Sequence, residues 1–393
     1  MYGFMDYLLR SFNKETGWSD QNLYSNLTGT SRALLDFVHP LGLHFHISSY
    51  PSQSFMSSYT LSTLPVLDGS MAYLCTTRPL SSITHTKHVP LHEMIEGYRE
   101  PPELKKHPEP WEWEVWQNGK RVDKKDSLLY GRMYIPSSTL EAMYTRRIAP
   151  TKQLILACVS DTKLPNGGTI TAEIQHDVGK WSTEYVYSTE GGMLGLRGLW
   201  NFGPDPRKPR TPPSPSLYSS HTGVHDTPPI PSGRLSAGAE IYYGALTKSA
   251  GMSLGLRYAS FASNQTPRTM TLTWNPLMGS VSTTYAVKNA LTNSAFCSRF
   301  DFNMFSYESN LALGCEIWQW RDGSLSTSTA SGMEKKDEDV KGVFKAQIGN
   351  SLGIGLQWEG RFKDFLFSLG TVLDLTNKTS PVRSVGLELQ YSS

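Results

Sequence analysis

The most constraining feature of this sequence is an alternation of apolar and polar residues with a period of two, which recurs from residue 43 to the C-terminal region. In residues 385–391, for example, the apolar side chains are at odd positions and the polar residues and glycine at even positions. The same alternation is present in residues 43–48, 170–175, 252–258 and 354–359. Successive side chains of a β-strand point to opposite faces, so each segment predicts a strand with one apolar and one polar face. Such strands suit a barrel that spans a membrane, with lipid outside and a wet interior.

The composition favours strands over helices and over disorder. The 393 residues include 33 glycines and 24 prolines, while aromatic residues make up 11% and charged residues only 18%. Glycine and proline are poor helix formers, whereas aromatic residues favour strands and are scarce in disordered chains. No stretch of 18 uninterrupted apolar residues occurs, so the sequence predicts no transmembrane helix. Alternating barrel strands remain compatible with a membrane, because they are not hydrophobic on average.

Three segments interrupt the alternation and are predicted to be long loops of a single barrel domain over residues 42–393. They are the Pro- and charge-rich range 77–128, the range 203–231 with nine prolines in 29 positions, and the Ser/Thr-rich, then charged range 321–340. Proline cannot donate to the ladder of a strand, so the second range in particular excludes a strand. The rest of this domain has room for about nineteen spanning strands of about 9–11 residues each, joined by tight turns. The predicted fold class is therefore all-β, a transmembrane antiparallel β-barrel of about nineteen strands.

Residues 1–41 differ from the barrel and are predicted to form a short helix followed by an extended segment. Apolar residues recur at helical spacing through the first fourteen residues, at Met1, Phe4, Met5, Leu8, Leu9 and Phe12. This spacing places them on one face of an amphipathic helix. No other helix is predicted. The N-terminal residues match neither a secretory signal nor an Arg-rich transit peptide.

Motifs of catalysis and of metal or nucleotide binding are weak in this sequence, and we expect neither an enzyme nor a bound cofactor. Residues 251–255 match the nucleophile elbow G-x-S-x-G, but they open an alternating strand where the elbow needs a strand-to-helix turn. His44 and His46 share one strand face and would supply two ligands where zinc needs three or four. The four cysteines include no CxxC pair, and a net charge of +2 gives no basic field for nucleic acid.

The last predicted strand contains a candidate sorting signal. Ser384, Gly386, Leu389 and Tyr391 supply a polar residue, a glycine two positions later, and two alternating apolar residues. This pattern resembles the β-signal by which mitochondrial barrels are recognised for insertion. A strand with one apolar face and a glycine can pair with the edge of an insertase. The alternative is an ordinary last strand.

A longer match lies within residues 17–43. Its motif residues are Trp18, Asn22, Tyr24, Leu27, Leu34, Leu35, Asp36 and Phe37. Together with residues 58–61 and 67–74, they closely resemble the fungal mitochondrial distribution and morphology barrel of the outer membrane, the membrane-embedded subunit of the ER–mitochondria encounter structure. The resemblance extends through the rest of the chain. One departure is Cys75, because family members tend to have an aromatic residue there, two positions after Tyr73, the possible partner contact.

The resemblance implies a porin-like (VDAC-like) barrel in the mitochondrial outer membrane, with its N-terminal segment associated with the pore. It implies partnership with the other subunits of the ER–mitochondria tether, which supports phospholipid exchange. It also implies partnership with the sorting and assembly machinery (SAM), where the barrel assists late assembly of the TOM translocase. The barrel would contact membrane lipids and anchor these complexes without bond chemistry of its own. Two alternatives remain open: a VDAC-like diffusion channel, which should show a basic bias on its lumen face, and a soluble all-β adhesion protein.

Overall fold

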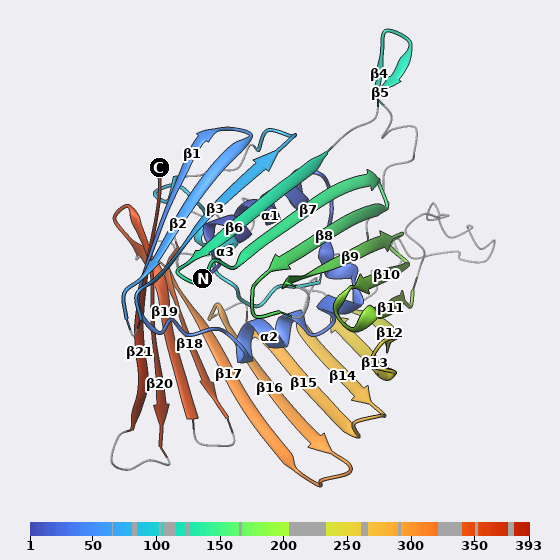
Figure 1. The fold of residues 1–393 in the computed structure, drawn as a ribbon. Coiled ribbons are helices and arrows are strands. Elements are labelled where there is room, and N and C mark those ends of the chain that lie inside the picture. Colours follow the sequence, from blue (N-terminus) through green and yellow to red (C-terminus); the bar gives the residue numbers. More distant parts are fainter. Residues whose placement is uncertain are drawn as a thin grey trace, which may run out of the picture.

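The chain forms a closed β-barrel with helices inside it (Figure 1). The computed structural model describes residues 1–64, 66–80, 85–101, 104, 115–122, 126–164, 167–203, 233–260, 266–289, 292–320, 340–349, 353–375 and 381–393. Nineteen strands form one hydrogen-bonded sheet, and a separate hairpin of β4 (Val115–Gln117) and β5 (Lys120–Val122) projects beyond it.

The barrel strands are β1 (Gly42–Ser52), β2 (Phe55–Ser62), β3 (Asp68–Thr76), β6 (Ser127–Ile135), β7 (Leu140–Ala149), β8 (Lys152–Ser160), β9 (Gly168–Asp177), β10 (Trp181–Ser188), β11 (Met193–Asn201), β12 (Gly233–Gly244), β13 (Ser249–Ser260), β14 (Arg268–Asn275), β15 (Ser280–Asn289), β16 (Ser294–Asn303), β17 (Ser309–Trp320), β18 (Val340–Ile348), β19 (Gly353–Phe362), β20 (Phe365–Asp374) and β21 (Val382–Ser392).

The barrel closes through one parallel pair of strands. Neighbouring strands in the chain pair antiparallel, whereas β1 runs parallel to β21, with Gly42 opposite Gly386 and Ile47 opposite Tyr391. Because directions alternate around an odd number of strands, the first and last strands point the same way. The predicted all-β barrel of about nineteen strands is confirmed, and its closing pair is the exception to the expected antiparallel pairing.

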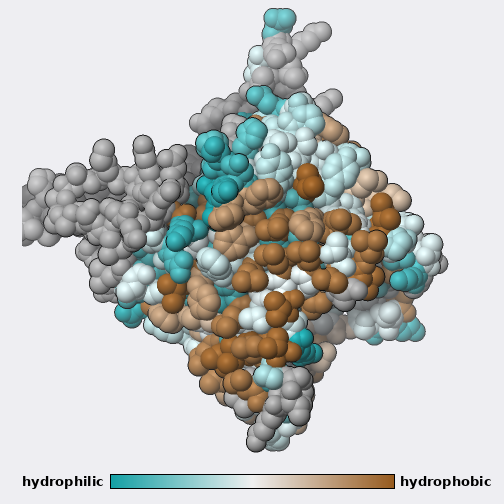
Figure 2. Space-filling view, turned by 90° about the vertical axis from the view of Figure 1, so that its left-hand side faces the viewer, coloured by the Kyte–Doolittle hydropathy of each residue, from teal (hydrophilic) through white to brown (hydrophobic). Residues whose placement is uncertain are grey.

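The alternation in the sequence becomes the two faces of the wall. In β12, Leu235, Ile241 and Tyr243 are exposed on the outer face, while Arg234 and Ser236 are buried on the inner face. Figure 2 shows a broad area of hydrophobic side chains on the side of the barrel that lies at the left in Figure 1. An apolar outer wall of this kind is what contact with lipid requires.

The two ends of the barrel differ in the length of their connections. The end at which β21 finishes is termed the long-loop end, and the opposite end the short-turn end. Because strand directions alternate, the connections β3–β6, β11–β12 and β17–β18 all lie at the long-loop end. The three ranges predicted as loops overlap these connections, but Ser127 and Leu128, at the end of the first range, already belong to β6. Of the ranges 203–231 and 321–340, only Gly203 and Val340 are within the described residues, and Val340 already begins β18.

The predicted loop 77–128 contains structure that its composition does not indicate. A short helix, α3 (Leu91–Met94), lies within it, and Val89 and Ile95 are buried in the interior of the barrel. The high content of proline and charge in the range as a whole obscures this short apolar stretch, which folds back into the lumen.

The predicted N-terminal helix is α1 (Phe4–Glu15), which lies inside the barrel (Figure 1). Its residues Phe4, Leu8 and Phe12 are at most 4% exposed. They pack in one core with inward-facing side chains of the wall, namely Met56, Leu74, Leu128, Val343 and Leu366. The alternation in the sequence suggests a wet interior. The structure differs, because part of the lumen beside these strands is an apolar core.

The structure contains further helices that the sequence does not predict. They include α2 (Gly29–Leu35), η1 (Asp20–Asn22) and η2 (Tyr24–Asn26). Segments of seven residues or fewer are too short to show a helical repeat of apolar residues. Among the described residues, no helix is both long and apolar enough to cross a membrane.

Candidate functional site: a belt on the inner wall

Residues 18–41, which carry the N-terminal sequence motif, lie against the inner wall of the barrel and are termed the belt. The belt makes its first contact beside β7 and then meets later strands in the order in which they follow around the barrel. At Gly42 the chain leaves the interior and becomes β1. The motif residues therefore form one continuous internal structure.

The belt begins with two anchors. The guanidinium carbon of Arg147, on β7, lies 4.3 Å from the ring centroid of the buried Trp18. Asn22 Nδ2 donates to Asp177 Oδ1 on β9 over 2.6 Å, and Asn201 Nδ2 on β11 donates to Asn22 Oδ1 over 2.7 Å. Both ends of the buried Asn22 amide are thus hydrogen-bonded, as burial of a polar group requires. This amide links two strands of the wall through the belt.

Tyr24 and Leu27 lie against β12 and β13. The Tyr24 hydroxyl is 3.1 Å from Ser253 Oγ, and burial raises the pKa of Tyr24. The wall beneath these side chains is formed by glycine. A Cβ at Gly238 would lie 2.5 Å from Tyr24 Cδ2, and one at Gly255 would lie 2.4 Å from Leu27 Cδ2. The belt can approach this closely only because both positions lack a side chain.

The middle of the belt is α2, which rests on small residues. Leu34 and Leu35 are at most 4% exposed and pack in one cluster with Ala286 on β15 and Ala295 on β16. A Cβ at Gly314, on β17, would lie 2.6 Å from the Leu34 carbonyl oxygen. Small residues on three successive strands thus allow direct contact between helix and wall. Burial of the two leucines contributes about 1.5–3 kcal/mol each.

Asp36 and Phe37 follow α2 and meet charged side chains of the wall. Arg299, on β16, donates from Nη1 to Asp36 Oδ2 over 2.6 Å and from Nη2 to Oδ1 over 2.9 Å. This two-bond geometry is directional, but the Asp36 side chain is 42% exposed, so we expect a contribution of at most about 1 kcal/mol. Phe37 is buried, and Lys345 Nζ on β18 lies 5.7 Å from its ring centroid.

The belt ends against the C-terminal strands. A Cβ at Gly355, on β19, would lie 2.5 Å from His39 Nε2, and burial lowers the pKa of His39. A Cβ at Gly370, on β20, would lie 2.7 Å from Pro40 Cδ, and one at Gly386, on β21, would lie 2.1 Å from the Pro40 carbonyl oxygen. The tightest approach of belt and wall is therefore at Gly386.

Six inward-facing glycines thus lie beneath the belt and are termed the glycine track: Gly238, Gly255, Gly314, Gly355, Gly370 and Gly386. A side chain at any of them would displace the belt. The prediction from sequence missed the track, although the sequence contains a signal for it. Segments 252–258, 354–359 and 385–391 each place a single glycine on the polar face of an alternating strand.

The four residues of the predicted sorting signal are divided between the two faces of β21. Ser384 and Gly386 belong to the inner face, and Leu389 and Tyr391 belong to the outer face. Gly386 therefore has a role in the finished barrel, where it accommodates Pro40. Its role in insertion stays a prediction.

Tyr73, the possible partner contact, lies on the outer face of β3. It is 44% exposed, and its ring stacks on that of Phe55 from β2, with the centroids 6.0 Å apart. Phe55 pairs in register with Cys75. The aromatic neighbour that the sequence lacks at position 75 is therefore supplied by the adjacent strand. Contact of Tyr73 with a partner stays a prediction.

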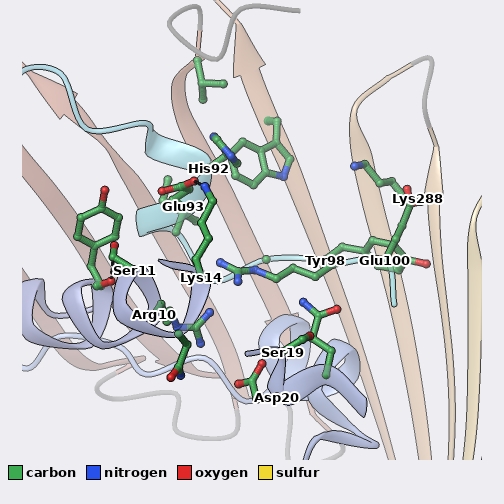
Figure 3. Close-up of a pocket in the computed structure, with 18 of the residues that line it drawn as sticks. Arg10, Ser11, Lys14, Ser19, Asp20, His92, Glu93, Tyr98, Glu100 and Lys288 are labelled. Atoms are coloured by element: carbon green, nitrogen blue, oxygen red, sulfur yellow. Dashed lines mark hydrogen bonds and ion pairs between the residues drawn. The ribbon is translucent and has the colours of Figure 1, made fainter. Parts of the chain in front are cut away.

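A cavity of about 670 Å³ remains in the lumen between α1, residues 92–100 and the wall (Figure 3). Arg10 and Lys14 of α1 and Lys288 of β15 line it together with carboxylates. Lys14 Nζ lies 2.8 Å from Glu93 Oε1. Charges of both signs are mixed along the cavity, so it lacks the one-sided basic lining that an anion-selective pore requires.

Two buried carboxylates elsewhere in the lumen, Glu359 and Glu316, have structural partners. Lys345 Nζ lies 2.8 Å from Glu359 Oε2, and both side chains are at most 1% exposed. Residues 89–98, which include α3 and lie inside the barrel, are termed the 89–98 stretch. The backbone N–H of Tyr98 donates to Glu316 Oε2 over 3.2 Å and so links this stretch to β17. In the part of the chain that the structure describes, no group of three or more His, Cys, Asp or Glu side chains is placed to hold a metal ion. The first pair joins the neighbouring wall strands β18 and β19, and the second contact positions an internal segment against the wall.

Comparison with known proteins relates the whole chain to one family. A sequence profile of the family described as mitochondrial distribution and morphology protein 10 matches residues 1–341 and 326–393. Relatives of that name from Sclerotinia sclerotiorum and Phaeosphaeria nodorum are each 49% identical to the chain. A relative of the same name from Yarrowia lipolytica is 38% identical. In each case the alignment covers 100% of this chain and 100% of the relative.

Proposed function

The chain belongs to the mitochondrial distribution and morphology protein 10 family, and from this premise we propose that it is the membrane-embedded scaffold of the ER–mitochondria tether. The protein is a β-barrel of the mitochondrial outer membrane with a role in mitochondrial distribution and morphology. In the proposed function it anchors the tether subunits and supports phospholipid exchange. It also associates with the SAM machinery during late assembly of the TOM translocase.

The observation that carries this proposal is the occupation of the lumen. α1 and the 89–98 stretch form an apolar core with the wall, and the belt covers the inner face from β7 to β21. A diffusion channel needs a continuous water-filled path, whereas a scaffold needs a rigid barrel with its outer wall and ends available to partners. This partial occupation of the lumen supports the scaffold over the VDAC-like channel.

The test compares two outer-face tyrosines in the full-length chain. Tyr73→Ala changes the predicted contact, and Tyr185→Ala changes a tyrosine of β10 that is 53% exposed. The tagged chain is isolated from fungal mitochondria in mild detergent, and the co-isolated SAM and tether subunits are quantified. We expect the unchanged chain and Tyr185→Ala to retain both sets of partners, and Tyr73→Ala to lose one of them.

The two parts of the proposal fail in different ways. Retention of both sets by Tyr73→Ala would reject Tyr73 as the contact and leave the scaffold unaffected. Absence of both sets from the unchanged chain, in mitochondria where the tether is intact, would reject the scaffold itself.

A further inference from the structure

Among the strand residues that register assigns to the outer face, charged side chains occur toward one end of the barrel only. Arg383 lies at a bulge of β21 and is assigned to neither face. Strand register assigns each residue of the described strands to the outer or inner face, except at the bulges. No outer-face position in these strands carries a carboxylate. Four outer-face positions carry basic side chains, and all four lie toward the long-loop end of their strands: Arg146, Lys152, His176 and Arg268.

Three of these positions form part of a compact cluster across β7–β11. Lys152 and His176 are directly opposite each other in the register of β8 and β9. The His176 ring meets the Trp181 ring edge-on, with centroids 4.9 Å apart, and Trp181 is opposite Trp200. Lys180, in the turn before β10, has its Nζ 5.6 Å from the Trp200 ring centroid. The basic–aromatic cluster is thus Arg146, Lys152, His176, Lys180, Trp181 and Trp200.

The cluster lies at the boundary between the apolar wall and the long-loop end. On the same outer face, Leu154 and Ile174 pair directly toward the middle of the barrel. Tryptophan side chains are enriched at such boundaries because the indole combines an apolar ring with a hydrogen-bond donor. The position of the cluster along the strands is therefore the level at which lipid headgroups meet a barrel.

Three cations of the cluster have no carboxylate partner among the residues that the structure describes. Within the described residues, none of Arg146, Lys152 and Lys180 forms an ion pair with Asp or Glu, although other basic residues of the barrel do. Lys180 Nζ instead donates to the carbonyl oxygen of Gly203, at 3.4 Å. A ligand phosphate would supply the missing negative charge, and each basic residue near an anionic membrane surface contributes about 1 kcal/mol of attraction.

We propose that the basic–aromatic cluster binds the headgroup of an anionic phospholipid in the leaflet at the long-loop end. The apolar wall below accommodates the acyl chains, the two indoles fix the depth of the headgroup, and the cations bind its phosphate. An acidic patch on a partner protein would match the charges. The lipid is favoured because the cluster continues directly into the lipid-facing wall. The inference depends on the membrane location of the barrel and not on the tethering role proposed above.

The test uses the full-length chain in nanodiscs of phosphatidylcholine that contain a minor fraction of phosphatidylinositol. Spin-labelled analogues of the two lipids report the relative affinity of the barrel surface for each. The double variant Lys152→Gln/Lys180→Gln removes two charges of the cluster. The matched control Lys163→Gln/Lys248→Gln removes two exposed lysines from turns at the short-turn end.

We expect the unchanged chain and the control to prefer phosphatidylinositol, and the cluster variant to lose about fivefold in preference for each charge removed. A second variant, Trp200→Leu, keeps the charges and should weaken the preference by a smaller factor. If the double variant does not assemble, the exposed Lys152→Gln alone supplies the comparison. Equal lipid preference in the cluster variant and the control would overturn the proposal. If the cluster variant then also loses a co-purifying acidic protein, the cluster binds that protein and not the lipid.

Discussion

At each position of the glycine track, the belt can approach the wall closely because glycine has no side chain. The approach is tightest at Gly386, where even the Cβ of alanine would lie 2.1 Å from the Pro40 carbonyl oxygen. The wall cannot yield freely at this position, because β21 is hydrogen-bonded to β20 on one side and to β1 on the other. Gly386 therefore has two roles to distinguish: it accommodates the belt in the finished barrel, and it belongs to the predicted sorting signal.

Two alanine substitutions distinguish the packing role of Gly386 from its predicted role in insertion. Gly386→Ala and Gly370→Ala both force a Cβ against Pro40, and each should destabilise the finished barrel by about 1–3 kcal/mol through overpacking. If residues 384–391 are recognised for insertion, only Gly386→Ala should reduce the carbonate-resistant fraction after import into isolated mitochondria. Equal insertion of the two variants would contradict the sorting signal and leave an ordinary last strand.

The apolar contacts of the belt should contribute more to stability than its ion pair. Leu34→Ala leaves a cavity among buried residues and should lower the free energy of unfolding by about 2–5 kcal/mol. Asp36→Asn removes a partly exposed pair with Arg299 and should cost at most about 1 kcal/mol. Denaturant titration in detergent micelles measures both values. A larger loss for Asp36→Asn would show that the ion pair, and not burial, holds the belt.

His39 should make the end of the belt sensitive to acid. Burial lowers its pKa below the ordinary value of about 6.5, so the unfolded chain binds a proton at this position more readily than the folded chain does. The stabilising contribution is complete above a pH of about 6.5 and is lost as the pH falls through that value toward the folded pKa. Thermal unfolding between about pH 7.5 and about pH 5 should therefore show a smaller acid-induced loss for His39→Asn. An identical pH dependence of the variant and the unchanged chain would contradict the role of His39.

At the scale of elements, α1 depends on the barrel for its helical structure. Twelve residues are marginal for an isolated helix in water, so the helix persists because Phe4, Leu8 and Phe12 are buried against the wall. Phe12→Ala should lower the free energy of unfolding by about 3–5 kcal/mol. Amide hydrogen exchange of residues 4–12 in the assembled protein should be slow, and exchange as fast as in an isolated peptide would refute the docking of α1. The exposed Lys14→Ala, at the same end of the helix as Phe12, is the control.

The elements differ in how far the sequence predicts them. The strands and α1 repeat one pattern over enough residues for the period to be recognised, and the strand count follows from the length that a bilayer requires. α2 and α3 are too short to show a period, and α2 is stable only because it meets small residues of strands hundreds of positions later. The belt was therefore predictable as a motif but not as a structure, since no local signal relates Pro40 to Gly386.

At the scale of the whole molecule, the occupied lumen predicts low conductance. The full-length chain in a planar bilayer should conduct far less than an open barrel of nineteen strands, because α1 and the 89–98 stretch fill part of the interior. Deletion of residues 2–15 removes α1, leaves the belt in place, and should raise the conductance. Porin-like conductance of the unchanged chain would restore the diffusion channel as the function. Unchanged conductance after the deletion would show that α1 does not obstruct the pore.

The difference between the two ends of the barrel has a consequence for how the chain crosses the bilayer. Each inserted hairpin carries one connection through the hydrocarbon, and the work of that transfer rises with the number of polar groups moved out of water. Connections such as residues 245–248 and 276–279 are short, whereas the 203–231 segment alone adds 29 residues rich in proline. If the short turns enter the bilayer first, the long connections stay on the side from which the chain arrives and do not cross the hydrocarbon. The compartment that delivers the unfolded chain is then the one that the long-loop end faces, so the direction of delivery fixes the sidedness of the finished barrel.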